Sequence, residues 1–284
     1  MAVDLDAAYA RCEEITRAQA KNFAYGIRLL PTPKRQAMSA LYAFARHVDD
    51  IGDGAASSDE KLVELAAVRE QVARAAKGRL AGDDLMWTAL ADAMVRYPMA
   101  PEALVEIVAG CEMDCRISRY ATFEDLVVYC RCVAGSVGRL SLSVFGSDDP
   151  GAPQLADTLG VALQVTNILR DIVEDRDVMG RVYLPAEDLE RFGCEPDASG
   201  PPAAMADLVR YEAGRARARY EEGLGLLDLL DRRSRACVAA MSGIYSRLLD
   251  RIEHEPLGVM SRRMSLPTWE KAWVAARSLA GMSA

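Results

Sequence analysis

The sequence is poor in the side chains that build most transition-metal and nucleophile sites. Its 284 residues include only 2 histidines, His47 and His254, and 7 cysteines. The cysteine count is odd and no Cys-x-x-Cys pair occurs, which argues against a disulfide framework and for reduced thiols in a cytosolic protein. Two histidines are too few to complete zinc sites around the closely spaced cysteines. We therefore interpret all nine side chains as structural or incidental.

Other absences exclude further classes of protein. Residues 1–6 lack the basic start and apolar run of a signal peptide. The longest apolar stretch, Leu126 to Phe145, contains Arg131 and Arg139, so we expect no transmembrane span. A net charge of -8 argues against nucleic acid as a partner. No Gly-x-Gly-x-x-Gly follows a strand pattern, which excludes a Rossmann site but not NADPH itself. These absences together predict a cytoplasmic protein.

Helical spacing runs through almost the whole chain. It occurs in segments 5–24, 33–53, 58–77, 83–97, 101–119, 122–146, 151–177, 203–229, 231–254 and 267–281, which are separated by glycine and proline. No segment shows sustained strand alternation, and Gly193 to Pro202 is the best candidate for a loop. With 51% hydrophobic residues and no recognisable linker, residues 1–284 are expected to form a single all-α domain.

Two acidic clusters stand out, each with aspartates four residues apart. In the first, Asp49 and Asp53 share an arc of roughly 60° with Tyr42 and Arg46, and apolar side chains occupy the opposite face. A like-charged pair at this spacing destabilises an isolated helix by about 0.2–0.5 kcal/mol, so a positive partner is expected. A solvated acidic face explains this first helix equally well.

The second cluster is harder to explain as a surface. Gln164, Asn167, Asp171 and Asp175 lie within an arc of roughly 80°, while apolar residues surround most of the remaining circumference. Buried charge is costly unless it is paired or bound to metal. This polar strip is therefore expected to face partners or a cavity.

The donor set indicates which metal such a cavity would hold. Carboxylates without cysteine or histidine suit Mg²⁺, which binds one or two of them and completes its shell with water and phosphate. Neither cluster has the alternating oxygen ligands and glycine turn of a calcium loop. Arg46, Arg170 and Arg181 flank the acidic groups, and guanidinium suits bidentate phosphate binding. The pattern predicts a diphosphate held through Mg²⁺.

Four ordered motifs resemble those of the squalene/phytoene synthase family. Leu41 to Asp53 resembles its first aspartate-rich motif, and Gln164 to Asp175 the second. Tyr129 to Gly138 is similar to its tyrosine and glycine helix, and Gly180 to Pro185 to its usual continuation. The resemblance extends from about residue 20 to 190 and is weaker beyond. It implies an isoprenoid synthase helical bundle with a central cavity.

The resemblance also implies roles for individual residues. Asp49, Asp53, Asp171 and Asp175 would hold Mg²⁺, and the polar and aromatic candidates are Tyr42, Arg46, Tyr129, Gln164, Asn167, Arg170, Arg181, Tyr245 and Arg262. Gln19 to Phe23 stands where many members carry a His-Ser-x-Ser-Phe segment, so the hydroxyl contact to diphosphate is missing and Lys21 is a candidate to replace it. Gly135 and Gly138 interrupt an apolar helix, where close helix packing explains them as well as a substrate contact does.

The implied activity is a head-to-head condensation of two prenyl diphosphates. Asn22 to Pro31 and the compact length resemble bacterial presqualene diphosphate synthases. We therefore expect the protein to condense two farnesyl diphosphates into presqualene diphosphate. Other enzymes would use this product to make squalene and hopanoids. Phytoene synthase, joining two geranylgeranyl diphosphates, and full squalene synthase are the alternatives. A non-catalytic assembly factor is a third, although such relatives lack the acidic residues kept here. Because a farnesyl-type substrate partitions into lipid, the sequence leaves peripheral membrane contact open.

Overall fold

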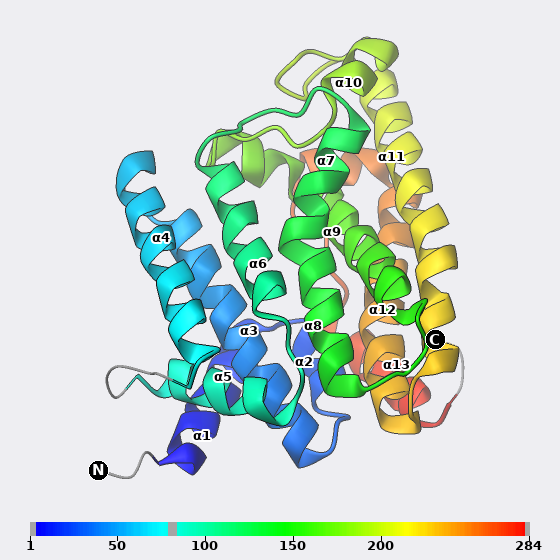
Figure 1. Ribbon diagram of the computed structural model, residues 1–284. Helices are drawn as coiled ribbons and strands as arrows, with labels where there is room; N and C mark the ends of the chain where they lie inside the picture. Colours follow the sequence, from blue (N-terminus) through cyan, green and yellow to red (C-terminus); the bar gives the residue numbers. More distant parts are fainter. Residues whose placement is uncertain (1–3, 79–83, 282–284) are drawn as a thin grey trace.

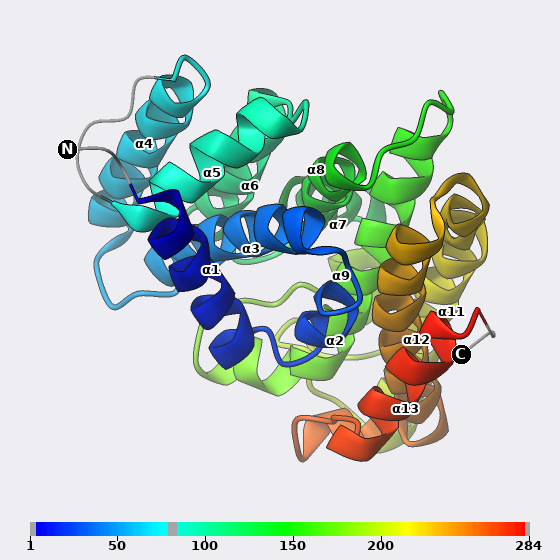
Figure 2. The ribbon, with the colours of Figure 1, turned by 90° about the horizontal axis from the view of Figure 1, so that it is seen from below.

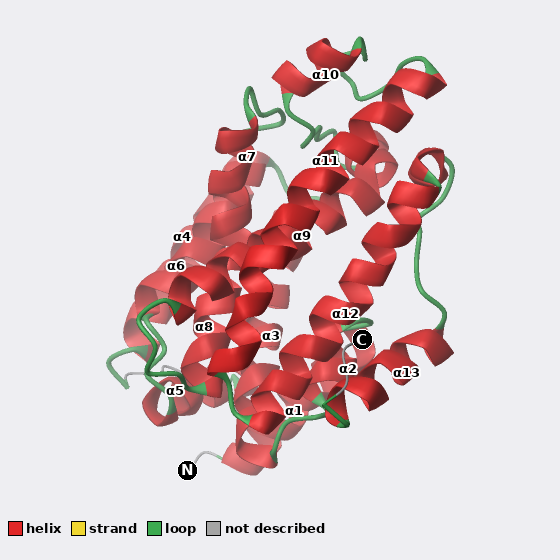
Figure 3. Ribbon diagram, turned by 90° about the vertical axis from the view of Figure 1, so that its right-hand side faces the viewer, coloured by secondary structure: helices red, strands yellow, loops and turns green. Residues whose placement is uncertain are grey.

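Helices account for nearly all of the regular structure in the computed structural model, which describes residues 4–78 and 84–281. Figure 3 shows helices joined by short loops, with no strand in these ranges. The expected all-α fold is therefore confirmed. Residues 1–3, 79–83 and 282–284 of the expected domain, including the first residue of the segment expected at 83–97, lie outside the described residues.

The elements follow the expected segments closely. They are α1 (Leu5–Gln19), α2 (Phe23–Ile27), α3 (Thr32–Gly52), α4 (Ser58–Ala75), α5 (Leu85–Arg96), α6 (Pro101–Asp114), α7 (Phe123–Cys130), a π-helix (Arg131–Gly135), α8 (Ser136–Phe145), α9 (Ala152–Asp177), α10 (Ala186–Phe192), α11 (Pro202–Gly223), a 3₁₀ helix (Leu224–Leu229), α12 (Arg232–His254), a second 3₁₀ helix (Pro256–Met260) and α13 (Thr268–Leu279). The loop expected at Gly193 to Pro202 is present, apart from the first helical residue at its end.

Three differences from the expected pattern matter for the site. The segment expected at 5–24 breaks after α1, where Ala20 leaves helical geometry with ψ 62°, and this places Lys21 in a turn. The segment expected at 122–146 contains a π-helix, a feature that often marks functional sites. Residues 186–192 form α10, which periodicity did not predict because it is only 7 residues long.

The helices pack into two groups around α8 and α9. Seen from below, α1 and α3–α6 lie on one side and α11–α13 on the other (Figure 2). Helix α9 contacts α8, α11, α12 and the π-helix, and buried side chains from both groups join one large hydrophobic core. In Figure 1, α10 and the loops after α6 and α9 close one end of the bundle.

One stretch of the described residues, Phe123–Phe145, is long and apolar enough to cross a membrane by length and composition. It packs against α6 and α9. Its two arginines, Arg131 and Arg139, both pair with Asp157 of α9. A core helix of a bundle passes the same test, and these contacts are those of a core helix.

Candidate active site

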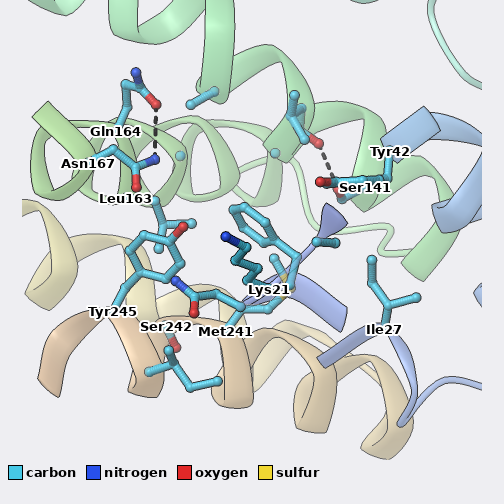
Figure 4. Close-up of a pocket in the computed structure, with 18 of the residues that line it drawn as sticks. Lys21, Ile27, Tyr42, Ser141, Leu163, Gln164, Asn167, Met241, Ser242 and Tyr245 are labelled. Carbon is cyan, nitrogen blue, oxygen red and sulfur yellow. Dashed lines mark hydrogen bonds between the residues drawn. The ribbon is translucent and has the colours of Figure 1, made fainter. Parts of the chain in front are cut away.

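A large cavity lies between α2, α3, α8, α9 and α12. It has a volume of about 800 Å³, and the segment from Arg263 to Lys271 completes its wall. This volume is within the range of about 300–1,000 Å³ that is usual for small-molecule sites. Figure 4 shows side chains from three directions around it, with Tyr42 on α3, Gln164 and Asn167 on α9, and Tyr245 on α12.

The first acidic motif supplies one wall of the cavity. Tyr42, Arg46 and Asp49 all line it from the same face of α3, as their spacing predicts. Arg46 pairs with Asp50, while its buried Nε has no hydrogen-bond partner in the described residues. Asp53 caps α3 and is not part of the lining. Its carboxylate accepts a hydrogen bond from Arg181 Nη1 at 3.1 Å.

The second acidic motif supplies the facing wall. Gln164, Asn167 and Arg170 line the cavity from α9, and Asn167 Nδ2 donates to Gln164 Oε1 at 3.3 Å (Figure 4). Arg170 Nε lies 2.8 Å from Asp171 Oδ1. The carbonyl oxygen of the Asn167 amide is buried without a partner in the described residues, so this strip presents a free acceptor toward the cavity.

Carboxylates of both motifs carry negative charge that the protein leaves unbalanced. Asp49 opens to the cavity, yet loss of bulk water around its carboxylate, followed by the nearby Asp53 charge, raises its pKa to about 7. Burial, followed by the charges of Asp171 and Glu174, raises the pKa of Asp175 to about 7. Both shifts show that the site disfavours these anions without a further cation. In the described residues, no three metal-ligating side chains converge, which is compatible with Mg²⁺ because that ion keeps waters and phosphate oxygens as ligands.

Cationic side chains gather at the same end of the cavity. Lys21, Arg170, Arg263 and Lys271 all line it, and Lys21 reaches into the space between α9 and α12 (Figure 4). Burial lowers the pKa of Lys271, and the nearby positive charges of Arg170 and Lys21 lower it further. Like charges that repel one another around a cavity favour an anionic ligand. Sequence reasoning missed Lys271, because its role depends on how α13 packs.

The arginine expected at position 262 lies elsewhere. Arg262 is exposed, does not line the cavity, and pairs with Glu255 at 2.8 Å. The neighbouring Arg263 lines the cavity and pairs with Asp171 at 3.0 Å and with Glu174 at 3.0 Å. The expected assignment was therefore wrong by one residue. It rested on spacing across an irregular segment, where no helical period fixes which side chain points inward.

Tyr129 is also misplaced by the sequence-based expectation, since it does not line the cavity. It is buried in a stack with Tyr120 and Tyr183, at ring-centroid distances of 5.6 and 5.1 Å. The hydroxyls of Tyr129 and Tyr183 donate to Asp114 at 3.0 and 2.7 Å. Tyr245, by contrast, lines the cavity as expected and packs against Phe23 at 5.5 Å.

Asp114 and Tyr183 connect this stack to the first acidic motif. Arg181 is buried with its Nε 4.0 Å from Asp114, and it donates to Asp53 and, at 3.2 Å, to the carbonyl oxygen of Gly52. The loops after α6 and α9 run side by side and bring these groups together, with Val182 N donating to Ser118 O at 2.8 Å. Sequence reasoning missed Asp114 because it lies outside both motifs.

The other end of the cavity is apolar. Met38 lies three turns before Asp49 on α3, and Ala156 lies about four turns before Arg170 on α9, so the space extends about 16–21 Å along these helices. Leu41, Val137, Phe145, Leu159 and Val238 line this end. A charged head and a long apolar wall fit an amphiphile with an anionic group at one end, which is the form of a prenyl diphosphate.

Comparison with known proteins agrees with this geometry. The squalene/phytoene synthase family model matches residues 16–270. The chain is 44% identical to a phytoene synthase from Mycobacterium tuberculosis over 98% of this chain and 92% of that protein, and 35% identical to a 15-cis-phytoene synthase from Synechococcus elongatus over 94% and 91%.

Solved structures show the same fold. A dehydrosqualene synthase crystallised with a ligand is 28% identical and superposes with a TM-score of 0.88, covering 98% of this chain and 97% of that one. A squalene synthase from Alicyclobacillus acidocaldarius is 30% identical with a TM-score of 0.81, covering 90% and 96%. The chain belongs to the squalene/phytoene synthase family, whose members are head-to-head prenyltransferases, and its fold is that of the isoprenoid synthases.

These relatives correct the expected product. The prediction of presqualene diphosphate is wrong, because the curated relatives described above are named phytoene synthases. The prediction rested on Asn22 to Pro31, which contributes only Asn22, Phe23 and Ile27 to the cavity lining. Most of the wall comes from α3, α8, α9 and α12. The expected link to squalene-forming and hopanoid enzymes followed from that product and loses its basis with it.

Proposed function

We propose that this protein is a phytoene synthase that joins two molecules of geranylgeranyl diphosphate. The observation that carries the proposal is the 44% identity to a protein of that name over 98% of this chain. The cavity supports it, because its charged end is continuous with a long apolar wall that suits a prenyl chain.

We assign the diphosphate to the cationic end and the metal to the acidic motifs. Lys21, Arg170, Arg263 and Lys271 would bind diphosphate oxygens, with Gln164 and Asn167 hydrogen-bonding beside them. The residues present fit Mg²⁺: Asp49, Asp53, Asp171 and Asp175 offer hard oxygens, and the raised pKa values of Asp49 and Asp175 reflect an unmet need for a cation. When bound, Mg²⁺ would neutralise charge on the departing diphosphate.

The protein's own groups then control an allylic cation. The C1–O bond of one substrate breaks, the electron pair leaves with diphosphate, and the double bond of the second substrate attacks C1. Proton loss closes a cyclopropane. The second diphosphate then departs and the ring opens. Loss of a second proton leaves a neutral hydrocarbon. The apolar wall excludes water that would quench the cations. The rings of Tyr42 and Tyr245 would stabilise positive charge, at about 0.5–2 kcal/mol each.

Product analysis tests the proposal directly. The purified chain is incubated with geranylgeranyl or farnesyl diphosphate and Mg²⁺, with and without NADPH, and the hydrocarbons are identified by mass. We expect phytoene from geranylgeranyl diphosphate without NADPH and two diphosphates released per product. A faster reaction with farnesyl diphosphate would favour a product of the dehydrosqualene type, the activity named for the structural neighbour. No product from either substrate would indicate the non-catalytic alternative.

Metal removal and two variants test the assigned roles. EDTA should stop turnover and Mg²⁺ should restore it. Asp49→Asn and Asp171→Asn should each lower kcat by at least about a hundredfold, equivalent to about 2.7 kcal/mol, because each removes a charged ligand with little change in volume. Circular dichroism would verify that helix content is kept. Near-normal turnover in both variants would contradict the metal assignment.

A further inference from the structure

Two tryptophans form an exposed face on α13. Trp269 and Trp273 lie one turn apart, and 70% and 42% of their surfaces are exposed. Trp87, in contrast, is buried against Phe44. On its inner side α13 buries Val274 and packs against α12 and α2, and Figure 2 shows it at the outside of the bundle. When two adjacent aromatic side chains are both exposed to water, the apolar surface that they share is typical of an interaction site.

The charge around these tryptophans is positive. Residues 257–279 carry four basic side chains and the single acid Glu270, and Arg262 and Arg263 among the four pair with acids outside this range, which leaves Lys271 and Arg277 on α13. Glu270 is buried and paired with Arg247 and Arg251. The guanidinium groups of Arg247 and Arg277 lie 4.8 and 4.7 Å from the centre of the Trp273 ring. Exposed indole rings, one of them flanked by arginines, are suited to the boundary between lipid headgroups and acyl chains.

The same segment forms part of the cavity wall. Arg263, Ser265 and Thr268 are exposed and also line the cavity, so the cavity reaches the surface beside the start of α13. The opening of the cavity and the tryptophan face therefore belong to one region of the surface.

We infer that the face formed by Trp269 and Trp273 docks on an anionic lipid bilayer and sets the cavity opening against it. The reason for such docking rests on the proposed function, because a product that has lost both diphosphates is a hydrocarbon that water does not dissolve. Anionic headgroups are attracted by the basic side chains, and the indoles insert at the headgroup level. The docking itself needs no substrate.

Vesicle binding of the full chain tests the inference. Flotation is measured without substrate, using phosphatidylcholine vesicles with or without about 30% phosphatidylglycerol. The test variant is Trp269→Ala/Trp273→Ala, and the matched control is Val63→Ala/Val95→Ala, which trims two side chains that are 71% and 81% exposed on α4 and α5. Turnover with detergent-dispersed substrate verifies folding and is expected to be unchanged in both.

We expect the wild type and the valine control to bind anionic vesicles at least tenfold more tightly than the tryptophan variant. Binding should weaken without phosphatidylglycerol, or when salt is raised from about 0.1 to about 1 M. Tryptophan emission should shift to shorter wavelength on binding. Equal binding of wild type and tryptophan variant, or no binding of the wild type, would overturn the inference. So would a wild-type dimer that the tryptophan change makes monomeric. Because binding is measured without substrate, these results do not depend on which prenyl diphosphate the site accepts.

Discussion

The contact between α8 and α9 at Gly138 provides a strict test of how the cavity wall is built. A Cβ at Gly138 would lie 2.9 Å from the carbonyl carbon of Ala156 and closer still to its oxygen. Both are backbone atoms of α9, so no side-chain rotation relieves the clash and the two helices must move apart. Gly138 also lines the cavity. The packing and cavity explanations that the sequence left open therefore both apply to this residue.

Gly214 offers a matched comparison. It lies within α11, and a Cβ there would meet nothing within 4 Å. Replacing either helical glycine by alanine gains about 1 kcal/mol of helix propensity, while overpacking at Gly138 costs about 1–3 kcal/mol. The propensity gain is common to both, so Gly138→Ala should be less stable than Gly214→Ala by about 1–3 kcal/mol. At about 2–4 °C per kcal/mol, this is a difference of about 2–12 °C in Tm.

Denaturation in guanidinium and thermal scans of both variants measure this difference. Gly214→Ala should be at least as stable as the wild type, and Gly138→Ala should also lose turnover because the cavity wall shifts. If Gly138→Ala is as stable as Gly214→Ala, the two helices do not meet backbone to backbone at this point. The account of the cavity wall would then be refuted.

Three further predictions follow from the site and the core. Arg263→Ala should lower kcat/KM for the prenyl diphosphate at least tenfold, whereas Arg262→Ala should leave it near normal; steady-state kinetics decide between them. Asp114→Asn should lower turnover at least tenfold with helix content kept, because Arg181 loses a charged partner; an unchanged rate would show that this network does not support Asp53. Burial, followed by the nearby Asp188 charge, raises the pKa of Glu212 to about 8. The folded state therefore binds this proton more tightly than the unfolded chain does. The contribution of Glu212 to the free energy of unfolding falls as pH rises from about 4.5 to about 8. Glu212→Gln should flatten that fall in guanidinium unfolding measured across this range, and an unaltered pH profile would count against it.

Local periodicity accounts for what the sequence could predict. Tyr42, Arg46 and Asp49 share a face because residues three and four apart on a helix always do, and Gln164, Asn167 and Arg170 line the cavity for the same reason. The motif order identified the family, and the family supplied the fold. None of these inferences needed knowledge of how distant segments meet.

The remaining features depend on tertiary packing. Asp114 and Arg181 meet because the loops after α6 and α9 run side by side, and no spacing within either segment indicates this. Lys271 reaches the cavity only because α13 packs against α12 and α2. Arg263 was missed because the segment before α13 is irregular. Chain length depends on the depth of a cavity assembled from five helices, which explains why an N-terminal resemblance gave the wrong product.

The charges near the two motifs support the proposal that they act together, although they lie far apart in the sequence. In the described part of the chain, no ion pair joins Asp49, Asp175 or Lys271 to a group of opposite charge. Asp49 and Lys271 line the cavity, and Asp175 lines a small separate pocket beside Arg181. The pKa values of Asp49 and Asp175 are raised, and the pKa of Lys271 is lowered. The charged form of each side chain is therefore disfavoured, and the three groups do not pair with one another. A cation at the carboxylates and an anion at the lysines would relieve both at once, and a metal diphosphate is both ions in one ligand. This charge arrangement therefore supports the proposed binding of a metal diphosphate.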